Sequence, residues 1–527
     1  MTLQSPLHGT LSLRLDANHI RFGSWRASIV DRIDSVMVVV MHVTPVRTSG
    51  WTPLLLLVCL TVTLGTTIPV GYFFGVLNAP AEIIKKWCQD ILASEYDTIV
   101  TSGQLDILWT SIVSIYLIGG ICGSCFSALC SDKYGRKGCL LISCVILVIS
   151  GILFNWCRAA KSLEMIMVGR FLGGIASALI FTAQPMYLLE AAPSELSGSV
   201  GVFTCIGVTG GILLAQVFTL SHLLGNERLW PYALSAYSLL VMASMVLIWW
   251  FPESPRWLYL HKGDTSGSEH ALRRLRGNDA EEEVQRELQE LKATLEAKDN
   301  NKASSLCSVL KDRELWMPLI LVCSFQATQQ LSGINAIFFY SLAILTDAGF
   351  SSGAATWLNL GIGGFNLCTS LLGPLLIHRF PRRPLMMLSC SVCGISLFAM
   401  SFGLFYLSSS DSTVLTYFCA GFILSFILGF QLGLGPIAYF IGSELLEDQP
   451  RPVAMSMGSL FSWIGNFLVG MCFPLLQSVW SSFAFIPCMC VCIYCLFLTW
   501  RYLPETRGRD PKDVKPLMSQ GFASKLN

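Results

Sequence analysis

The feature that most constrains this chain is a series of apolar runs, each long enough to cross a lipid bilayer. A helix that spans the hydrocarbon core needs about 20 consecutive, mostly apolar residues. Six such runs precede residue 252, at roughly 53–75, 106–129, 139–157, 164–185, 199–219 and 231–251; six more follow residue 315, at roughly 316–345, 354–378, 384–407, 414–442, 452–476 and 481–502. The pattern predicts an all-α membrane protein with twelve transmembrane helices in two six-helix bundles, as in transporters built from repeats.

Composition supports the membrane interpretation. Of the 527 residues, 53% are hydrophobic and only 13% are charged, and the mean hydropathy is +0.58. A soluble globular protein carries about 25% charged residues. Charge at half that level excludes a soluble enzyme, a nucleic-acid binder and a disordered chain. The formal net charge of +1 points to no particular partner, so we expect a small-molecule substrate, the lipid bilayer and no nucleic acid.

The 20 cysteines do not resemble a disulfide framework, because most of them lie inside apolar runs. A cysteine on a buried membrane helix behaves as a small hydrophobic residue, so packing is the expected role. We find no arrangement of His, Asp and Ser typical of catalysis and no spacing typical of metal ligands. The sequence therefore predicts neither an enzyme nor a bound cofactor or metal.

The runs and the polar stretches between them suggest five parts. These are a cytosolic N-terminal tail (1–50), an N-terminal six-helix bundle (51–251), a cytosolic helical linker (252–315), a C-terminal six-helix bundle (316–503) and a cytosolic C-terminal tail (504–527). Within the linker, residues 280–298 place apolar side chains at spacings of three and four between charges, which predicts an amphipathic surface helix.

Basic residues in short loops indicate the orientation. Lys133, Arg136 and Lys137 follow the second run, and Arg379, Arg382 and Arg383 follow the eighth. Cytosolic loops carry an excess of Lys and Arg, so we expect both loops, the linker and both termini in the cytosol. The 77–105 loop then faces outside.

Two motifs recur in register in the two halves. The segment 132–137 (DKYGRK) after the second run is paired with 378–383 (HRFPRR) after the eighth; Pro252-Glu253-Ser254 at the end of the sixth run is paired with Pro504-Glu505-Thr506 at the end of the twelfth. Two coincidences in register indicate an internal duplication.

Charged residues gather where the runs end, and we expect them at the cytosolic face. Charges at membrane depth are costly, so they pair or take part in function. Ion pairs between neighbouring helix ends are strong when water is excluded and weak when they are hydrated. Such pairs suit a latch that closes the cytosolic side. The candidates for this latch are Asp132, Arg136, Arg170, Glu190, Glu253, Arg256, Arg382, Glu444, Arg451 and Glu505, with Glu164 beside Arg170 at the start of the fourth run.

The chain resembles the sugar porter family of the major facilitator superfamily, and most closely the animal facilitative glucose transporters. The resemblance rests on 132–137, Gly169-Arg170, 185–187 (PMY), 252–256 (PESPR), 329–336 (QQLSGINA) and Pro504-Glu505-Thr506, and it covers about residues 53 to 512. It implies a central sugar site between two bundles, exposed alternately to each side of the membrane.

The amides of the seventh run are the main candidates for substrate binding. An amide offers a donor and an acceptor together, which suits a polyhydroxyl ligand, and it carries no charge. By spacing alone, such a cluster could also join helices. The resemblance implies that Gln329, Gln330, Asn335 and Asn366 bind substrate, that Trp463 and Tyr439 line the cavity, and that Cys205 tunes selectivity. It also implies a bending segment at 433–439 and gate aromatics at 338–340.

Departures from the family pattern bear on substrate and coupling. Cys205, Gln431, Tyr439 and Ser462 stand where glucose-transporting members usually carry Gln, an acid, Trp and Asn, and Ser197 replaces an Arg. Proton-coupled members carry an Asp in the first run, where this chain has Phe73. We therefore expect facilitative transport of a hexose such as glucose, with proton-coupled transport, transport of fructose, a polyol or an organic anion, or a sugar sensor with little transport as alternatives. The plasma membrane is the default location; the oligomeric state is not indicated.

Overall fold

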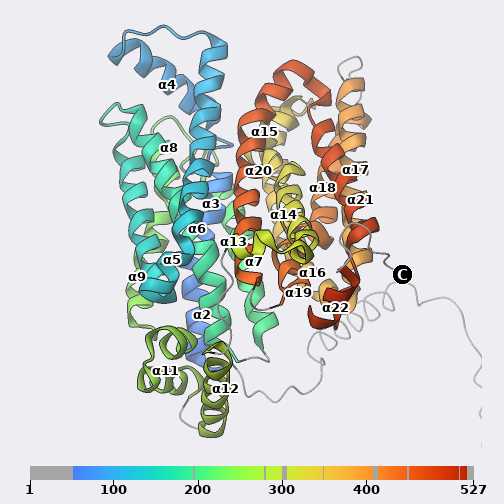
Figure 1. Ribbon diagram of the computed structural model, residues 1–527. Helices are drawn as coiled ribbons and strands as arrows, with labels where there is room; N and C mark the ends of the chain where they lie inside the picture. The colour runs from blue at the N-terminus through green and yellow to red at the C-terminus, as the bar shows by residue number, and fades with distance from the viewer. Residues whose placement is uncertain are drawn as a thin grey trace, which may run out of the picture. The chain divides into compact units, whose positions relative to one another are not determined.

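The computed structural model describes residues 51–193, 196–277, 280–299, 306–347, 349–407, 413–447, 450–509 and 511–518 (Figure 1). The predicted tail 1–50 lies outside these residues. Within them, every predicted apolar run coincides with a helix or a pair of helices, so the all-α prediction is confirmed. In the part of the chain that the structure describes, eight helical segments are long and apolar enough to cross a membrane.

The N-terminal bundle is formed by the first six runs. Its helices are α2 (Pro53–Gly65), α3 (Thr67–Gly75), α5 (Ser102–Trp156), α6 (Leu163–Ala191), α7 (Ser197–Phe218), α8 (Trp230–Ser235) and α9 (Tyr237–Trp250). The long helix α5 contains the second and third runs, which meet at a sharp corner. Gly135 makes this corner, with φ of 83° and ψ of 170°. A positive φ is strained for residues with a side chain, so this position favours glycine.

The C-terminal bundle is formed by the other six runs, and two of them are broken. Its helices are α14 (Trp316–Leu331), α15 (Ile334–Asp347), α16 (Ser352–Arg379), α17 (Arg382–Leu407), α18 (Thr413–Gly429), α19 (Gly435–Leu445), α20 (Arg451–Trp480) and α21 (Ile486–Tyr502). The seventh run breaks between α14 and α15 at Gly333, whose φ is 90°. The tenth run contains a π-helical turn, Phe430–Leu434, immediately before Pro436. Such turns interrupt α-helices at functional positions.

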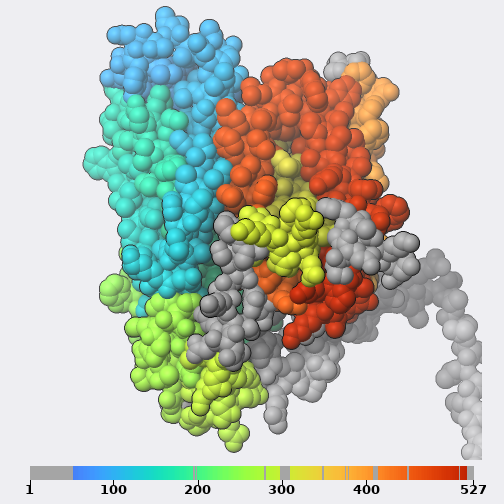
Figure 2. Space-filling view, viewed as in Figure 1, coloured from blue at the N-terminus to red at the C-terminus, as the bar shows by residue number. Residues whose placement is uncertain are grey.

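Short helices cap one end of each bundle. The linker contains α10 (Pro255–Trp257), α11 (Thr265–Arg276), α12 (Glu281–Asp299) and α13 (Leu306–Lys311), and the C-terminal segment contains α22 (Pro511–Met518). The predicted amphipathic helix is α12, which buries Val284. In Figure 2, α11 and α12 (green) cover the lower end of the N-terminal bundle. We call this end, which also carries the 132–137 and 378–383 corners, the basic end; α4 (Ala81–Glu95) lies at the opposite end (Figure 1).

Candidate functional site

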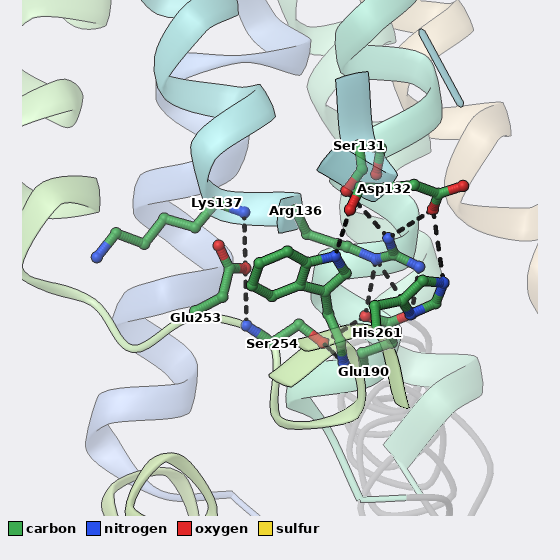
Figure 3. Close-up of polar contacts among 9 residues, drawn as sticks. Ser131, Asp132, Arg136, Lys137, Glu190, Glu253, Ser254 and His261 are labelled. Atoms are coloured by element: carbon green, nitrogen blue, oxygen red, sulfur yellow. Dashed lines mark hydrogen bonds and ion pairs between the residues drawn. The ribbon is translucent and has the colours of Figure 1, made fainter. Parts of the chain in front are cut away.

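A cluster of charged side chains surrounds the 132–137 corner of the N-terminal bundle (Figure 3). The Arg136 guanidinium donates to the Glu190 carboxylate, with Nε 3.2 Å from Oε2, and to Asp132, with Nη1 3.1 Å from Oδ1. Nη1 also donates to the Ser131 carbonyl at 3.1 Å. Only 4% of the Arg136 side chain and 12% of the Glu190 side chain are exposed, so this pair is nearly dry, whereas Asp132 is 56% exposed. Ser254, from the linker, donates to the same Glu190 oxygen, Oε2.

Glu253, also from the linker, packs against the same corner. Its Oε1 accepts hydrogen bonds from the backbone N–H groups of Lys137 at 2.9 Å and Ser254 at 2.8 Å. Burial raises the pKa of Glu253 above its ordinary value, and the backbone donors partly oppose that rise. A Cβ at Gly135 would lie 2.3 Å from Glu253 Oε2, so this glycine is needed for space as well as for its φ.

The C-terminal bundle repeats this arrangement at the 378–383 corner. Arg382 donates to Glu444, with Nη2 3.1 Å from Oε1, and to the Ile377 carbonyl at 2.8 Å. Glu505 accepts from the backbone N–H of Arg382 at 2.9 Å, and Thr506 donates to Glu444. The pairs Arg136 with Glu190 and Arg382 with Glu444 are therefore duplicated elements, each built within one bundle. The structure thus brings together Asp132, Arg136, Glu190 and Glu253 in one cluster, and Arg382, Glu444 and Glu505 in the other.

Two further latch candidates lie at this end with different contacts. The Arg256 side chain is exposed on α10. Arg451, at the start of α20, donates to the Leu446 carbonyl at 3.2 Å and so braces the turn after α19. The Ser197 side chain lies outside the described part of the structure.

The prediction that Arg170 and Glu164 lie at the basic end is wrong. Helix α6 begins at the opposite end, where Glu164 accepts a hydrogen bond from Tyr96 at 2.7 Å. Successive transmembrane runs alternate in direction, so the start of the fourth run lies opposite the 132–137 corner. Glu164 belongs to that opposite surface.

Arg170 lies inside the N-terminal bundle, with 1% of its surface exposed. Its guanidinium donates to the carbonyls of Phe73 at 3.0 Å, Val113 at 3.0 Å and Ile112 at 3.4 Å. It also lies over the rings of Tyr116, at 4.8 Å, and Phe73, at 5.6 Å. Carbonyl dipoles and π faces therefore surround this charge within the described chain. Cation–π contacts of this kind strengthen when desolvated.

The predicted amides of the seventh run form one hydrogen-bonded cluster. Gln330 donates through Nε2 to Gln329 Oε1 at 3.3 Å and to Ser462 Oγ at 3.0 Å, and its Oε1 accepts from Asn335. Gln329 donates to the Gly435 carbonyl beside the π-helical turn. Helices α14, α15, α19 and α20 thus meet at these amides.

A second amide pair and an aromatic residue lie in the same bundle. Gln431 of the π-helical turn donates to Asn366 Oδ1 of α16 at 2.8 Å. Tyr439 is 48% exposed, although its hydroxyl lies beside Gln330 and also near Cys205 of the N-terminal bundle. Its hydroxyl therefore lies where the two bundles meet, at the level of the amide cluster.

Trp463 and Phe339, one of the predicted gate aromatics, contact the N-terminal bundle through their rings. The Trp463 indole packs edge-on against Tyr116 and Phe181, and a Cβ at Gly120 would lie 2.3 Å from it. Phe339 contacts Phe74 at 6.0 Å between ring centroids, while Tyr340 donates to the Gly470 carbonyl at 3.1 Å.

Sequence reasoning missed a buried polar chain that connects the bundles toward the opposite end. Asn78 donates to Ser341, Ser341 donates to Asn359 at 2.6 Å, and Gln216 donates to the same Asn359 oxygen at 3.0 Å. Asn78 and Gln216 belong to the N-terminal bundle, and the other two belong to the C-terminal bundle. Polar residues in membrane helices that must pair across helices were the available signal.

Comparison with known proteins places this architecture in a family. Residues 58–517 match the family described as "Sugar (and other) transporter". The chain belongs to this sugar transporter family. It is 32% identical over 457 residues to facilitated glucose transporter member 7 of Mus musculus, covering 87% of this chain and 88% of that protein. It is also 32% identical over 463 residues to member 3 of Homo sapiens, covering 88% and 92%.

Solved structures agree with the fold of the sugar transporter family. The partially occluded inward-open form of the xylose transporter XylE from E. coli matches with a TM-score of 0.71 at 21% identity, over 86% of this chain and all of that chain. The proton:xylose symporter XylE bound to 6-bromo-6-deoxy-D-glucose matches with a TM-score of 0.70. The predicted major facilitator fold, with twelve transmembrane helices in two six-helix bundles, is confirmed. The chain is thus a multi-pass membrane protein of a transporter family rather than of an enzyme family.

Proposed function

We propose that this protein is a facilitative transporter, a uniporter, that moves a hexose such as glucose across the membrane by alternating access. The observation that carries the proposal is the uncharged amide cluster of Gln329, Gln330 and Asn335, which lies beside the Tyr439 hydroxyl where the two bundles meet. The family membership and the names of the relatives support sugar transport.

The chemistry of the cluster suits a neutral polyhydroxyl ligand. Each amide offers both a donor and an acceptor, so it can exchange its present partner for a sugar hydroxyl. An unpaired buried polar group costs about 1–3 kcal/mol, which explains why the amides bond to one another and to Ser462. We assign substrate binding to Gln329, Gln330, Asn335 and Asn366, with Tyr439, Trp463 and Cys205 lining the path.

The surroundings of Arg170 favour uniport over proton coupling. A proton-driven cycle needs a group whose charge changes inside the membrane. Phe73 contributes a carbonyl and a ring to Arg170, and neither can take up a proton near neutral pH. Proton-coupled transport is therefore the weaker alternative.

The contacts between the bundles support an alternating-access cycle. The polar chain from Asn78 to Gln216 and the Phe74–Phe339 contact hold the two bundles together toward the opposite end. In the cycle we propose, these contacts break when the site opens to the other side. In the same cycle the charge clusters at Arg136 and Arg382, each formed within one bundle, brace the basic end of their own bundle.

The orientation and the location are part of the same proposal. The basic corners favour a cytosolic basic end, with both termini cytosolic, and the plasma membrane is the location we propose. We also propose the division into an N-terminal tail (1–50), two bundles (51–251 and 316–503), a linker (252–315) and a C-terminal tail (504–527).

The altered contacts of the site favour one second candidate, a transporter of fructose or a polyol. Gln330 bonds to Ser462 and Gln431 bonds to Asn366, so two of the positions where this chain departs from the glucose transporters take part in the amide contacts. A sugar sensor that binds but scarcely transports is separated from both by flux through the purified protein.

The test is uptake into proteoliposomes that contain the purified protein. Labelled glucose is supplied with a panel of unlabelled hexoses, pentoses and polyols, with and without an inward proton gradient. We expect competition by hexoses and net uptake that stops at equal concentrations on both sides. Accumulation against the sugar gradient when protons flow inward would contradict uniport.

A further inference from the structure

Two cationic side chains meet where α9, the last helix of the N-terminal bundle, ends. Lys137, from α5, donates through Nζ to the carbonyls of Trp249 at 2.8 Å and Phe251 at 2.7 Å. Arg274, from the linker helix α11, donates through Nη2 to the carbonyl of Trp250 at 3.1 Å. These carbonyls belong to three consecutive residues, so both charges lie at the same end of α9. We call Lys137 and Arg274 the α9 cation pair.

The arginines in the last turn of α11 differ in their partners. Arg273 is neutralised within the linker, because its Nη2 lies 2.7 Å from Glu269 Oε1. Arg276 is neutralised in the same way, with Nε 2.8 Å from Glu287 Oε1. Arg274 lies between them in the sequence, yet it forms no ion pair with a carboxylate in the part of the chain that the structure describes. Its charge is directed to the end of α9 instead.

Lys137 is also without an ion pair among the described residues. Glu253 accepts a hydrogen bond from the Lys137 backbone N–H at 2.9 Å, whereas the ammonium donates to the α9 carbonyls. Figure 3 shows the Lys137 side chain extending away from the Arg136 cluster. An ammonium has three N–H donors and a guanidinium has five, and the carbonyls take two of the first and one of the second. The cation pair therefore keeps its charge and N–H groups that these carbonyls do not use.

Two exposed tryptophans place the cation pair at the surface of the membrane. Trp249 is 76% exposed and Trp250 is 58% exposed, at the end of a helical segment that is long and apolar enough to span the bilayer. The Arg274 guanidinium carbon lies 5.0 Å from the centre of the Trp250 ring. Tryptophan is enriched at the level of the lipid headgroups, so the pair lies at the depth of the lipid phosphates.

The duplicated corner shows what the cap of a helix end requires. There Arg383 donates through Nη2 to the carbonyl of Trp500 at 2.6 Å, and the Trp500 side chain is exposed. The C-terminal bundle therefore caps its last helix, α21, with the residue that corresponds to Lys137. In the N-terminal bundle, Arg274 adds a second cation from a separate helix to this shared cap.

We propose that the α9 cation pair binds the phosphate of an anionic phospholipid in the membrane leaflet at the basic end. A guanidinium can hold two phosphate oxygens at once, and the ammonium adds a point charge beside it. Basic pockets of membrane helices at this depth recognise anionic headgroups. A zwitterionic lipid carries its own ammonium, which neutralises its phosphate, so we expect it to bind more weakly. This site does not depend on the proposed transport.

The apolar face of α9 favours a lipid over a free phosphate. Leu239 and Val246 are exposed and lie seven residues apart, so they share one face of the helix. That face continues to Trp249 and Trp250, one turn beyond Val246. The acyl chains of a lipid whose phosphate lies at the cation pair would pack along these side chains, whereas a soluble phosphate would leave them uncovered.

The first experiment compares two lipids that share the phosphodiester and the acyl chains. The full-length protein, purified in detergent, is titrated with phosphatidylglycerol or phosphatidylcholine, and bound lipids are counted by native mass spectrometry. The wild type should bind its first phosphatidylglycerol more tightly than its first phosphatidylcholine, and it should melt at a higher temperature in phosphatidylglycerol. A phosphatidylglycerol with a photoactivatable group near the headgroup should cross-link to the end of α9 or to α11.

Four variants make the test specific. Lys137→Gln and Arg274→Gln should each weaken binding of the first phosphatidylglycerol by about five-fold, the contribution of one cation near a membrane surface. Arg274→Lys keeps the charge and should retain most of the wild-type affinity, which separates loss of charge from loss of packing. Arg273→Gln is the matched control, because it removes the same charge from the next position of α11, where the side chain is already paired with acids. It should bind phosphatidylglycerol as the wild type does.

Equal affinity of the wild type for the two lipids would overturn the proposal. Equal losses in Arg273→Gln and Arg274→Gln, or cross-links confined to other helices, would also overturn it. Displacement of bound phosphatidylglycerol by inorganic phosphate would show that the site takes a free anion, which contradicts a lipid site. The cross-linking uses the wild type, so it decides even where a variant fails to fold. None of these measurements needs transport, so a protein that takes up no glucose still tests the lipid site.

Discussion

The two bundles have the same arginine–glutamate pair at the corner of the basic end, but the pair is more buried in the N-terminal bundle than in the C-terminal bundle. Arg136 is 4% exposed and pairs with two carboxylates, whereas Arg382 is 15% exposed and pairs with Glu444. The N-terminal corner turns at a positive-φ glycine, and the C-terminal corner turns at Pro381. Duplication has kept the arginine, its glutamate and the capping hydroxyl of Ser254 or Thr506, while the surroundings of each pair diverged.

The substrate side shows the reverse asymmetry. The amides that we assign to the sugar all belong to the C-terminal bundle, and the N-terminal bundle contributes Cys205 and the ring packing around Trp463. The comparison indicates that the N-terminal bundle has the more buried ion pair, while the C-terminal bundle provides the amides that we assign to the sugar.

The largest effect should come from removing the arginine of the tighter corner. Arg136→Ala leaves Glu190 nearly buried without its charged partner, and breaking such a pair costs about 3–5 kcal/mol. Arg382→Ala should cost less, because its pair is more exposed. Thermal unfolding of both variants in detergent checks the order, and a larger loss for Arg382→Ala would reverse the comparison.

The next largest effect on stability should come from replacing the corner glycine, Gly135. Gly135→Ala should destabilise the protein by more than the ~1–3 kcal/mol that its glycine-specific backbone, with φ of 83° and ψ of 170°, costs, because its Cβ would also collide with Glu253. Gly263→Ala is a control for a positive φ without a collision, since Gly263 has φ of 69° with open space around it, and it should cost about 1–2 kcal/mol. Equal melting temperatures for the two variants would show that Glu253 does not restrict this corner.

The binding asymmetry is tested by Gln330→Ala against Cys205→Ala. Loss of one substrate hydrogen bond, worth about 0.5–1.5 kcal/mol, should raise the KM of sugar uptake by up to roughly ten-fold in Gln330→Ala. Surface expression should stay intact, and Cys205→Ala should change KM less. A larger change in KM for Cys205→Ala would place the main polar contact in the N-terminal bundle.

The smallest effect concerns the pH dependence of Glu253. Burial raises its pKa in the folded state, so the stability it contributes is present in acid and is lost as the pH rises through that value. Glu253→Gln mimics the protonated form. The melting temperature of the variant, relative to that of the wild type, should therefore increase as the pH rises from about 4 to 7. A gain in the opposite direction would mean that the backbone donors outweigh burial.

Much of the fold could be predicted because apolar length and duplicated motifs determine it locally. Gly433 and Pro436 indicated a break in the tenth run, and a π-helical turn lies there. The pairing of Gln431 with Asn366 could not be predicted, since it depends on how α16 packs against that turn. The misplacement of Arg170 has a different cause: counting the alternation of helix directions would have corrected it from the sequence alone.

The partners of Arg170 could not be predicted in the same way. Backbone carbonyls leave no signature in a sequence, and the rings of Phe73 and Tyr116 approach it from separate helices. Tertiary packing alone brings these groups to one point.

The most direct test of the central claim is the steady-state distribution of labelled hexose in proteoliposomes that contain the wild type or Gln330→Ala, with and without an inward proton gradient. The account predicts that the wild type equilibrates the sugar to equal concentrations whatever the proton gradient, and that Gln330→Ala reaches the same end point with a raised KM. Uphill accumulation driven by protons, or kinetics in Gln330→Ala identical to the wild type for every sugar tested, would contradict it.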